Sequence, residues 1–262
     1  MSAMRLLFDV GNTRVKWAWH DGQRWLDPDA CALDVFNADA VFALRDFDEA
    51  WVASMDKTAV YQDLVKVFDQ HFASSSINLT TVDVTKKACG IENTYLNIDR
   101  LGVDRWLSVI GARSLIPHGD IIVVDAGTAI NIECLDANNV YQGGAILPGF
   151  RLMHDSLVGR VPAIQSNVTE TLPSIGKNTE QCVNFGVGYG VAGAVERVVE
   201  EMQAFLLAEN TQQSVPVRAL LSGGNAWSLE KRMKLSVKTE RIDNLVLFGL
   251  LEVARQSESS KV

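Results

Sequence analysis

The chain has 262 residues, of which 47% are hydrophobic, so it can bury a large core as one domain or two lobes. Its formal net charge of -8, with no local basic patch, argues against a nucleic-acid-binding protein. No apolar run approaches the roughly 20 residues of a membrane helix, and four scattered cysteines without a CxxC pair fit a cytoplasmic protein without zinc or disulfides.

The first predicted element is a β-hairpin. The segment Arg5 to Val10 is apolar, Gly11-Asn12 is a turn signal, and β-type alternation resumes from Val15 to His20. A glycine turn of this kind can direct N–H groups at phosphate oxygens. The carboxylate of Asp9 would be repelled there unless a cation such as magnesium lay between, and Lys16 could reach the phosphates as a point charge.

Two amphipathic helices are predicted next, over residues 63–72 and 103–115. The second opens with Gly102-Val103-Asp104-Arg105, and two interpretations of that start remain open. Asp104 could simply stabilise the helix through its dipole. Alternatively, Asp104 could act as a base beside an anion-binding arginine, as phosphoryl transfer to a hydroxyl group requires.

A second hairpin is predicted from Ile121 to Cys134, around the turn Asp125-Ala126-Gly127-Thr128-Ala129. Its order of strand, Asp, spacer, Gly, small polar residue and strand repeats the pattern at residues 8–13, which indicates an internal duplication. Ordinary turn chemistry explains either copy alone, whereas two matched copies favour a pair of phosphate-binding turns. We therefore predict two α/β lobes, residues 1–117 and residues 118–262.

The second half holds two further glycine-rich segments. In residues 143–149 glycines flank one short apolar strand, and Ser222-Gly223-Gly224 follows another strand. The second segment could pack against an adenosine or could be a plain strand-to-helix loop. Long helices are predicted from about Tyr189 to Ala208 and over residues 244–254, with a disordered tail from about Gln256.

Taken together, these motifs resemble the type III pantothenate kinases, members of the superfamily that includes actin, sugar kinases and Hsp70. The resemblance runs from Asp9 to about Asn225, and its most specific parts are GxDR at 102–105 and GGxIxPG at 143–149. It implies two ribonuclease H-like (actin-like) lobes of mixed sheets flanked by helices, with an ATP cleft between them. It also implies a homodimer, to which the helix after Gly186 contributes.

The resemblance further implies ATP-dependent phosphorylation of pantothenate to 4'-phosphopantothenate, the first step of coenzyme A biosynthesis. Asp104 would be the general base, Asp125 the ligand of a monovalent cation, potassium or ammonium, and Asp9 a magnesium ligand, directly or through water. The implied ATP contacts are Asp9, Val10, Gly11, Asn12, Thr13, Arg14, Val15, Lys16, Thr128, Ser222, Gly223 and Gly224. The implied pantothenate contacts are Tyr95, Gly102, Val103, Asp104, Arg105 and Thr179.

Two other functions remain as alternatives. A non-enzymatic regulator of the same fold could bind nucleotide without transferring phosphate, although such a protein has no need of a base at Asp104. Another actin-like kinase could act on a sugar, or a hydrolase of the superfamily on polyphosphate. The GxDR and GGxIxPG segments separate the pantothenate kinases from these.

Overall fold

A computed structural model describes residues 3–54, 58–169, 175–209 and 216–259. By its internal contacts the chain forms two compact units, Met1–Leu115 with Asn244–Val262, and Ile116–Asp243. The division after residue 115 lies close to the lobe boundary expected at 117. The last helix, however, is grouped with the first unit, although chain order had assigned it to the second lobe. That these units act as two lobes stays a prediction.

The first unit contains a five-stranded mixed sheet in the order β3-β2-β1-β4-β5. The strands β1 (Arg5–Val10), β2 (Arg14–His20) and β3 (Trp25–Ala32) pair antiparallel, whereas β4 (Glu49–Ser54) and β5 (Leu79–Val82) continue the sheet in parallel. Every residue of β1 is buried, because helices cover both faces of the sheet.

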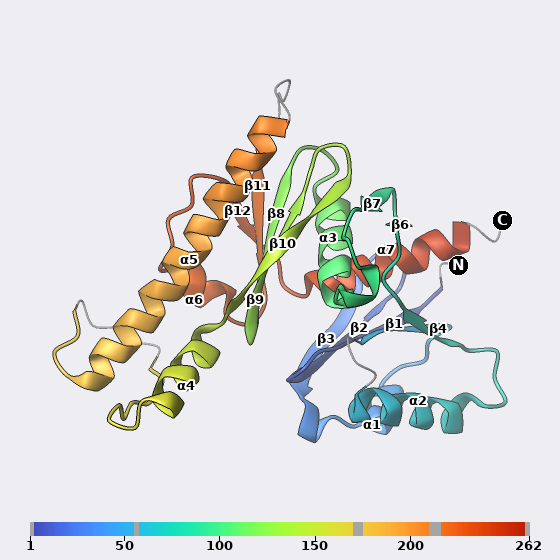
Figure 1. Ribbon diagram of the computed structural model, residues 1–262. Helices are drawn as coiled ribbons and strands as arrows, with labels where there is room; N and C mark the ends of the chain where they lie inside the picture. Colours follow the sequence, from blue (N-terminus) through green and yellow to red (C-terminus); the bar gives the residue numbers. More distant parts are fainter. Residues whose placement is uncertain (1–2, 55–57, 170–174, 210–215, 260–262) are drawn as a thin grey trace. The chain divides into compact units, whose positions relative to one another are not determined.

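The helices of this unit lie on opposite sides of the sheet (Figure 1). The helices α1 (Ala38–Phe42) and α2 (Ala59–Phe72) pack on one face, and α3 (Val103–Leu115) and α7 (Leu245–Ser259) pack on the other. Short elements complete the unit: η1 (Leu33–Val35), β6 (Lys87–Ala88), β7 (Ile91–Asn93) and η2 (Ile98–Arg100). This arrangement brings the start of α3 and the β1–β2 turn into one unit.

The second unit repeats the strand order and directions of the first. Its strands run β12-β11-β8-β9-β10, with β8 (Ile121–Ala126), β9 (Ala129–Leu135) and β10 (Val140–Pro148) antiparallel, and β11 (Arg218–Ser222) and β12 (Lys238–Arg241) parallel to β8. The same topology in both units confirms the predicted α/β fold of mixed sheets and supports the internal duplication.

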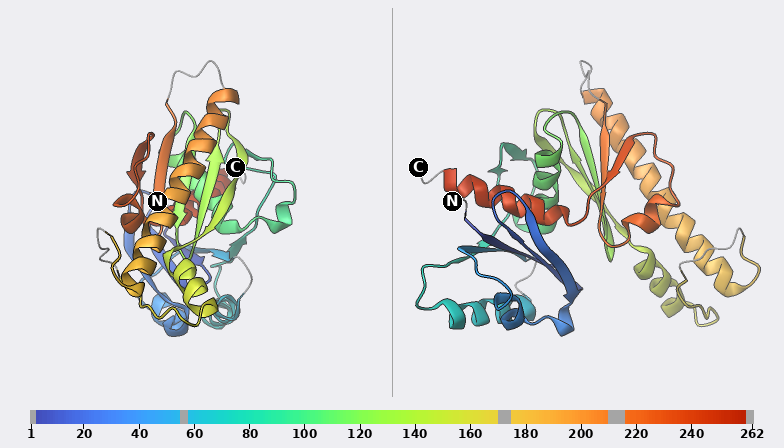
Figure 2. Two further views of the ribbon diagram at one scale, coloured as in Figure 1. Left: turned by 60° about the vertical axis from the view of Figure 1, so that its left-hand side comes forward. Right: turned by 180° about the vertical axis from the view of Figure 1, so that it is seen from behind.

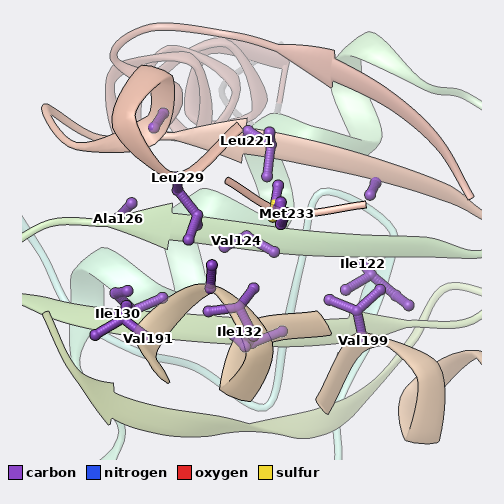
Figure 3. Close-up of a cluster of buried hydrophobic side chains, with 14 of the residues drawn as sticks. Ile122, Val124, Ala126, Ile130, Ile132, Val191, Val199, Leu221, Leu229 and Met233 are labelled. Atoms are coloured by element: carbon purple, nitrogen blue, oxygen red, sulfur yellow. The ribbon is translucent and has the colours of Figure 1, made fainter. Parts of the chain in front are cut away.

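The long helix α5 (Thr179–Glu209) lies along one face of the second sheet (Figure 2). The helices α4 (Phe150–Arg160) and α6 (Ala226–Glu230) belong to the same unit. Figure 3 shows the core they enclose, where side chains of β8 and β9 such as Val124 and Ile132 meet Val191 and Val199 of α5. This packing fixes the β8–β9 turn at the edge of a rigid core.

Both predicted hairpins and the helix over 103–115 are confirmed. The start predicted for the long helix, near Tyr189, is wrong, because Asn178 caps a helix that begins at Thr179. The Gln181 N–H donates to Asn178 Oδ1 at 2.9 Å, and Gln181 Oε1 accepts from the Lys177 N–H at 3.0 Å. This reciprocal capping stabilises a start that apolar periodicity alone did not locate.

The predicted disorder from Gln256 is wrong as far as Ser259, because contacts hold the last turn of α7. Gln256 Oε1 accepts a hydrogen bond from the Cys89 N–H at 2.8 Å, and Glu258 forms an ion pair with the buried Arg5. Residues 260–262 lie outside the described part of the chain.

Candidate active site

The turn between β1 and β2 presents backbone and small polar side chains. The Gly11 N–H donates to the Arg14 carbonyl oxygen at 3.0 Å, and a Cβ added at Gly11 would lie 3.3 Å from the same oxygen. Asn12 and Thr13 at the tip are exposed. Because glycine leaves the backbone accessible, a phosphate oxygen can approach the N–H groups of Asn12 and Thr13 closely.

Asp9 and Lys16 are paired across the same hairpin. Lys16 Nζ lies 3.5 Å from Asp9 Oδ2, and only 7% of Asp9 is exposed. Burial raises the pKa of the Asp9 carboxyl above its usual value, and the positive charge of Lys16 offsets part of that shift. The side chains of Val10 and Val15 are buried, so these two predicted ATP contacts can offer only their backbone.

The turn between β8 and β9 is built in the same way. Its Gly127 N–H donates to the Ala129 carbonyl oxygen at 3.0 Å, and Asp125 precedes the turn as Asp9 precedes the first. In the sheet Asp125 pairs with Asn131 on β9 and with Ser222 on β11. The predicted cation ligand is therefore next to amide and hydroxyl oxygens, which are further ligands that a hard cation accepts.

The GGxIxPG segment ends against this second turn. The Gly149 N–H donates to the Thr128 carbonyl oxygen at 3.0 Å, and a Cβ at Gly149 would lie 2.7 Å from the Gly127 oxygen. No side chain fits there without moving the turn. The structure thus brings together two motifs that the sequence presented separately.

The predicted adenosine loop also packs against the turn. Gly223 has a φ of +89°, and a Cβ there would lie 2.5 Å from Asp125 Oδ1. Asn225 follows this loop and donates two hydrogen bonds to the turn. Its backbone N–H donates to the Ala126 oxygen at 2.9 Å, and its Nδ2 donates to the Gly127 oxygen at 3.1 Å. The loop, the turn and the GGxIxPG segment therefore form one surface of the second unit.

Asp104 and Arg105 occupy the first turn of α3. Asp104 Oδ1 accepts a hydrogen bond from the Arg105 N–H at 2.8 Å, which holds the carboxylate at the positive end of the helix dipole. The Arg105 side chain is buried, and its Cζ lies 5.6 Å from the centre of the Tyr95 ring. Tyr95 is thus in contact with Arg105, and Asp104 adjoins Arg105. Asp104 and Arg105 directly follow Gly102 and Val103 at the start of the helix.

Asn93 positions Tyr95 and was missed by the sequence analysis. Its Oδ1 accepts a hydrogen bond from the Tyr95 N–H at 3.0 Å, while its Nδ2 donates to the Thr85 oxygen at 3.1 Å. The side chain is almost fully buried. The turn-forming pattern of an Asn two residues before Tyr95 was the available signal.

Thr179 belongs to the second unit, whereas the other predicted pantothenate contacts belong to the first. It is exposed at the first residue of α5, directly after the Asn178 cap.

The acidic groups of the site suit a cation that arrives with a nucleotide. Within the described residues, no cluster of three His, Cys, Asp or Glu side chains could hold a metal ion. Magnesium is commonly held by one or two carboxylates together with substrate phosphates and water. The single carboxylates of Asp9 and Asp125 fit that mode of binding. In the same part of the chain, no helix is both long and apolar enough to cross a membrane.

The two units have equal topology, and each has a glycine turn that follows an aspartate. This is the actin-like fold. A Campylobacter jejuni protein assigned to the Baf family of transcriptional activators is similar in structure, with a TM-score of 0.55, 17% identity and coverage of 97% of this chain and 99% of that one. A Sinorhizobium meliloti protein assigned as a 2-dehydro-3-deoxygalactonokinase gives a TM-score of 0.53, 9% identity and coverage of 97% and 99%. These likenesses show the fold.

Sequence comparison identifies the family within that class. The family model of the type III pantothenate kinases matches residues 5–201. Type III pantothenate kinases of Alkalilimnicola ehrlichii and Chromobacterium violaceum are 32% and 33% identical to this chain, covering 96% of it in both cases and 98% and 99% of their own lengths. The chain belongs to the type III pantothenate kinase family.

Proposed function

We propose that this chain phosphorylates pantothenate with ATP to give 4'-phosphopantothenate, the first step of coenzyme A biosynthesis. The observation that carries the proposal is the presence, in one unit, of a phosphate-type turn with Asp9 and Lys16 and of the Asp104-Arg105 start of α3. The four cysteines are free thiols, which fits the reducing cytoplasm where we place the reaction.

Asp104 acts as the general base in this proposal. Its carboxylate takes the proton of the primary hydroxyl of pantothenate as that oxygen forms its bond to the γ-phosphorus and the bond to ADP breaks. Arg105 and Tyr95 hold the acceptor, since their contact fixes a positive charge beside the base. Transfer of this kind depends mostly on positioning and charge neutralisation, and Thr179 of the second unit supplies a further substrate contact.

Each of the two turns is a phosphate-binding element in this proposal. The N–H groups of Asn12 and Thr13 in the first turn, and that of Thr128 in the second, donate to phosphate oxygens, and Lys16 adds a positive charge. Magnesium, when bound, neutralises phosphate charge, and Asp9 is the carboxylate that would hold it, directly or through water. The Ser222-Gly223-Gly224 loop contacts the adenosine, supported by its packing against the second turn.

An ADP-release assay with pantothenate, a panel of hexoses, polyphosphate and water as acceptors tests this function. We expect release that depends on pantothenate and is absent with the other acceptors. Turnover with a hexose and none with pantothenate would reject the proposal in favour of a sugar kinase, and nucleotide binding without turnover would favour a regulator.

We also propose that Asp125 binds a monovalent cation, potassium or ammonium. The pairing of Asp125 with Asn131 and Ser222 supports it, because all three provide oxygen ligands. The same assay should then lose activity when potassium is replaced by a large organic cation. In the Asp125→Asn variant, that dependence on potassium should be lost together with most of the rate.

A homodimer formed through α5 is the assembly we propose. Gly186 and Gly193 on this helix have open space where a side chain would lie, and at Gly190 a Cβ would meet only Met153 Cε, at 4.0 Å. Tyr189 beside them is 48% exposed. The glycines leave room for a second helix to approach, aromatic residues such as Tyr189 are enriched at interfaces, and the family resemblance implies the same helix.

The Gly190→Arg variant should sediment as a monomer where the wild-type protein sediments as a dimer. The matched control is Gly159→Arg on α4, where an added Cβ meets no protein atom within 4 Å. A Gly190→Arg protein that sediments like the wild type would contradict the proposed interface.

A further inference from the structure

The hairpin formed by β6 and β7 leads directly to Tyr95, one of the proposed acceptor contacts. Its two strands pair Ala88 with Ile91, so Cys89 and Gly90 form a two-residue turn. Their φ angles are +48° and +76°, the left-handed pair of values typical of a type I′ turn. Since a side chain at positive φ is strained, contacts outside the turn determine this conformation of Cys89.

The last turns of α7 provide such contacts at the tip of the hairpin (Figure 1). Gln256 Oε1 accepts a hydrogen bond from the Cys89 N–H at 2.8 Å and lies 3.4 Å from Cys89 Sγ. Burial raises the pKa of the Cys89 thiol to about 11, and the negative charge of Glu252 adds to the shift. The thiol therefore keeps its proton at neutral pH and donates a hydrogen bond to the same oxygen. One glutamine side chain thus holds both donors of Cys89.

The other end of the hairpin is fixed by Asn93. Its N–H donates to the Lys86 oxygen at 2.9 Å, and its Nδ2 donates to the Thr85 oxygen at 3.1 Å. Its Oδ1 accepts a hydrogen bond from the Tyr95 N–H at 3.0 Å. Tyr95 therefore follows any displacement of the hairpin, together with its ring, whose centre lies 5.6 Å from Arg105 Cζ.

Helix α7 also contacts α3, the helix that begins with the Asp104-Arg105 pair. A Cβ added at Gly249 would collide with the Leu107 carbonyl group, so the two helices approach each other closely at the backbone. Helix α7 thus contacts α3 through Gly249 and the hairpin through Gln256. These two contacts place the hairpin relative to the start of α3.

We propose that Gln256 is a positioning residue for the acceptor site. By holding the tip of the β6–β7 hairpin on α7, it keeps the Tyr95 ring beside Arg105 and so raises the affinity for the acceptor. The inference rests on the proposed function in one respect, because it takes Tyr95 and Arg105 as acceptor contacts. Gln256 itself lies near the end of the last helix, in the serine-rich stretch for which the sequence predicted disorder.

Steady-state kinetics of the Gln256→Ala variant test the assignment. The loss of this hydrogen bond should raise the KM for pantothenate roughly 2- to 10-fold, while kcat and the KM for ATP stay at wild-type values. Gln256→Glu should restore the wild-type KM, because its carboxylate can accept from the same N–H. The matched control is Ser257→Ala, since Ser257 Oγ donates within α7, to the Ala254 oxygen at 2.8 Å.

Amide hydrogen exchange without substrates tests the contact itself. In Gln256→Ala the N–H groups of Cys89 and Tyr95 should exchange faster than in the wild type, whereas those of α3 should not change. An unchanged KM for pantothenate, an equal rise in the KM for ATP, or unchanged exchange at Tyr95 would overturn the assignment. A wild-type enzyme that does not turn over pantothenate would reject the proposed function, and the exchange rates would then decide alone whether Gln256 holds the hairpin.

Discussion

At the scale of single residues, Asp9 shows how a buried carboxylate lowers the stability of the folded protein. Burial raises its pKa, so the folded chain binds this proton more tightly than the unfolded chain does. Ionising Asp9 therefore costs folding free energy as the pH rises from the unfolded-state value, 3.8, through the higher folded-state value. The cost is complete above both values, and Lys16 offsets only part of it.

The Asp9→Asn variant should consequently be at least as heat-stable as the wild-type protein at pH 7. Its midpoint of thermal unfolding, followed by circular dichroism without nucleotide, should exceed that of the wild type, and the difference should narrow as the pH is lowered through the raised pKa of Asp9. The same variant should bind magnesium-ATP about 10- to 100-fold more weakly, because a charged contact is lost. A variant that unfolds well below the wild type at pH 7 would contradict this account of Asp9.

Residue patterns were sufficient to locate Asp9 and Asp125, because a repeated order of strand, aspartate and glycine is visible along the chain. They were insufficient for Asn93, whose importance depends on contacts with Thr85 and Tyr95 that form only when the chain folds.

At the scale of elements, the contact between α3 and α7 holds the first unit together across a long separation in sequence. A Cβ at Gly111 would lie 2.9 Å from the Gly249 nitrogen, and a Cβ at Gly249 would collide with the Leu107 carbonyl group. Periodicity predicted both helices. It could not show that the last one packs in the first unit, because partner choice depends on close backbone approach at these two glycines.

The Gly249→Ala variant should therefore be destabilised by about 1 to 3 kcal/mol, as expected for an overpacked interface. Urea unfolding followed by circular dichroism measures this as a lower midpoint. Gly159→Ala is the control, because its added methyl group meets no protein atom. An unchanged midpoint for Gly249→Ala would show that α7 does not rest on α3 as described.

At the scale of the whole molecule, two units of one topology each contain a turn of one design, and the Asp104-Arg105 start of α3 belongs to the first unit. The sequence indicated this duplication because turn residues recur at fixed places in each half. The register of α5 and the capping of its start could not be obtained from apolar periodicity, since glycines at 186, 188 and 190 interrupt the pattern.

The rate of pantothenate-dependent ADP release by the Asp104→Asn variant tests the central claim most directly. Loss of a positioned general base should lower kcat by about 10²- to 10⁴-fold, while the affinity for magnesium-ATP and the unfolding midpoint stay at wild-type values. An Asp104→Asn enzyme that turns over pantothenate at the full rate would contradict the account.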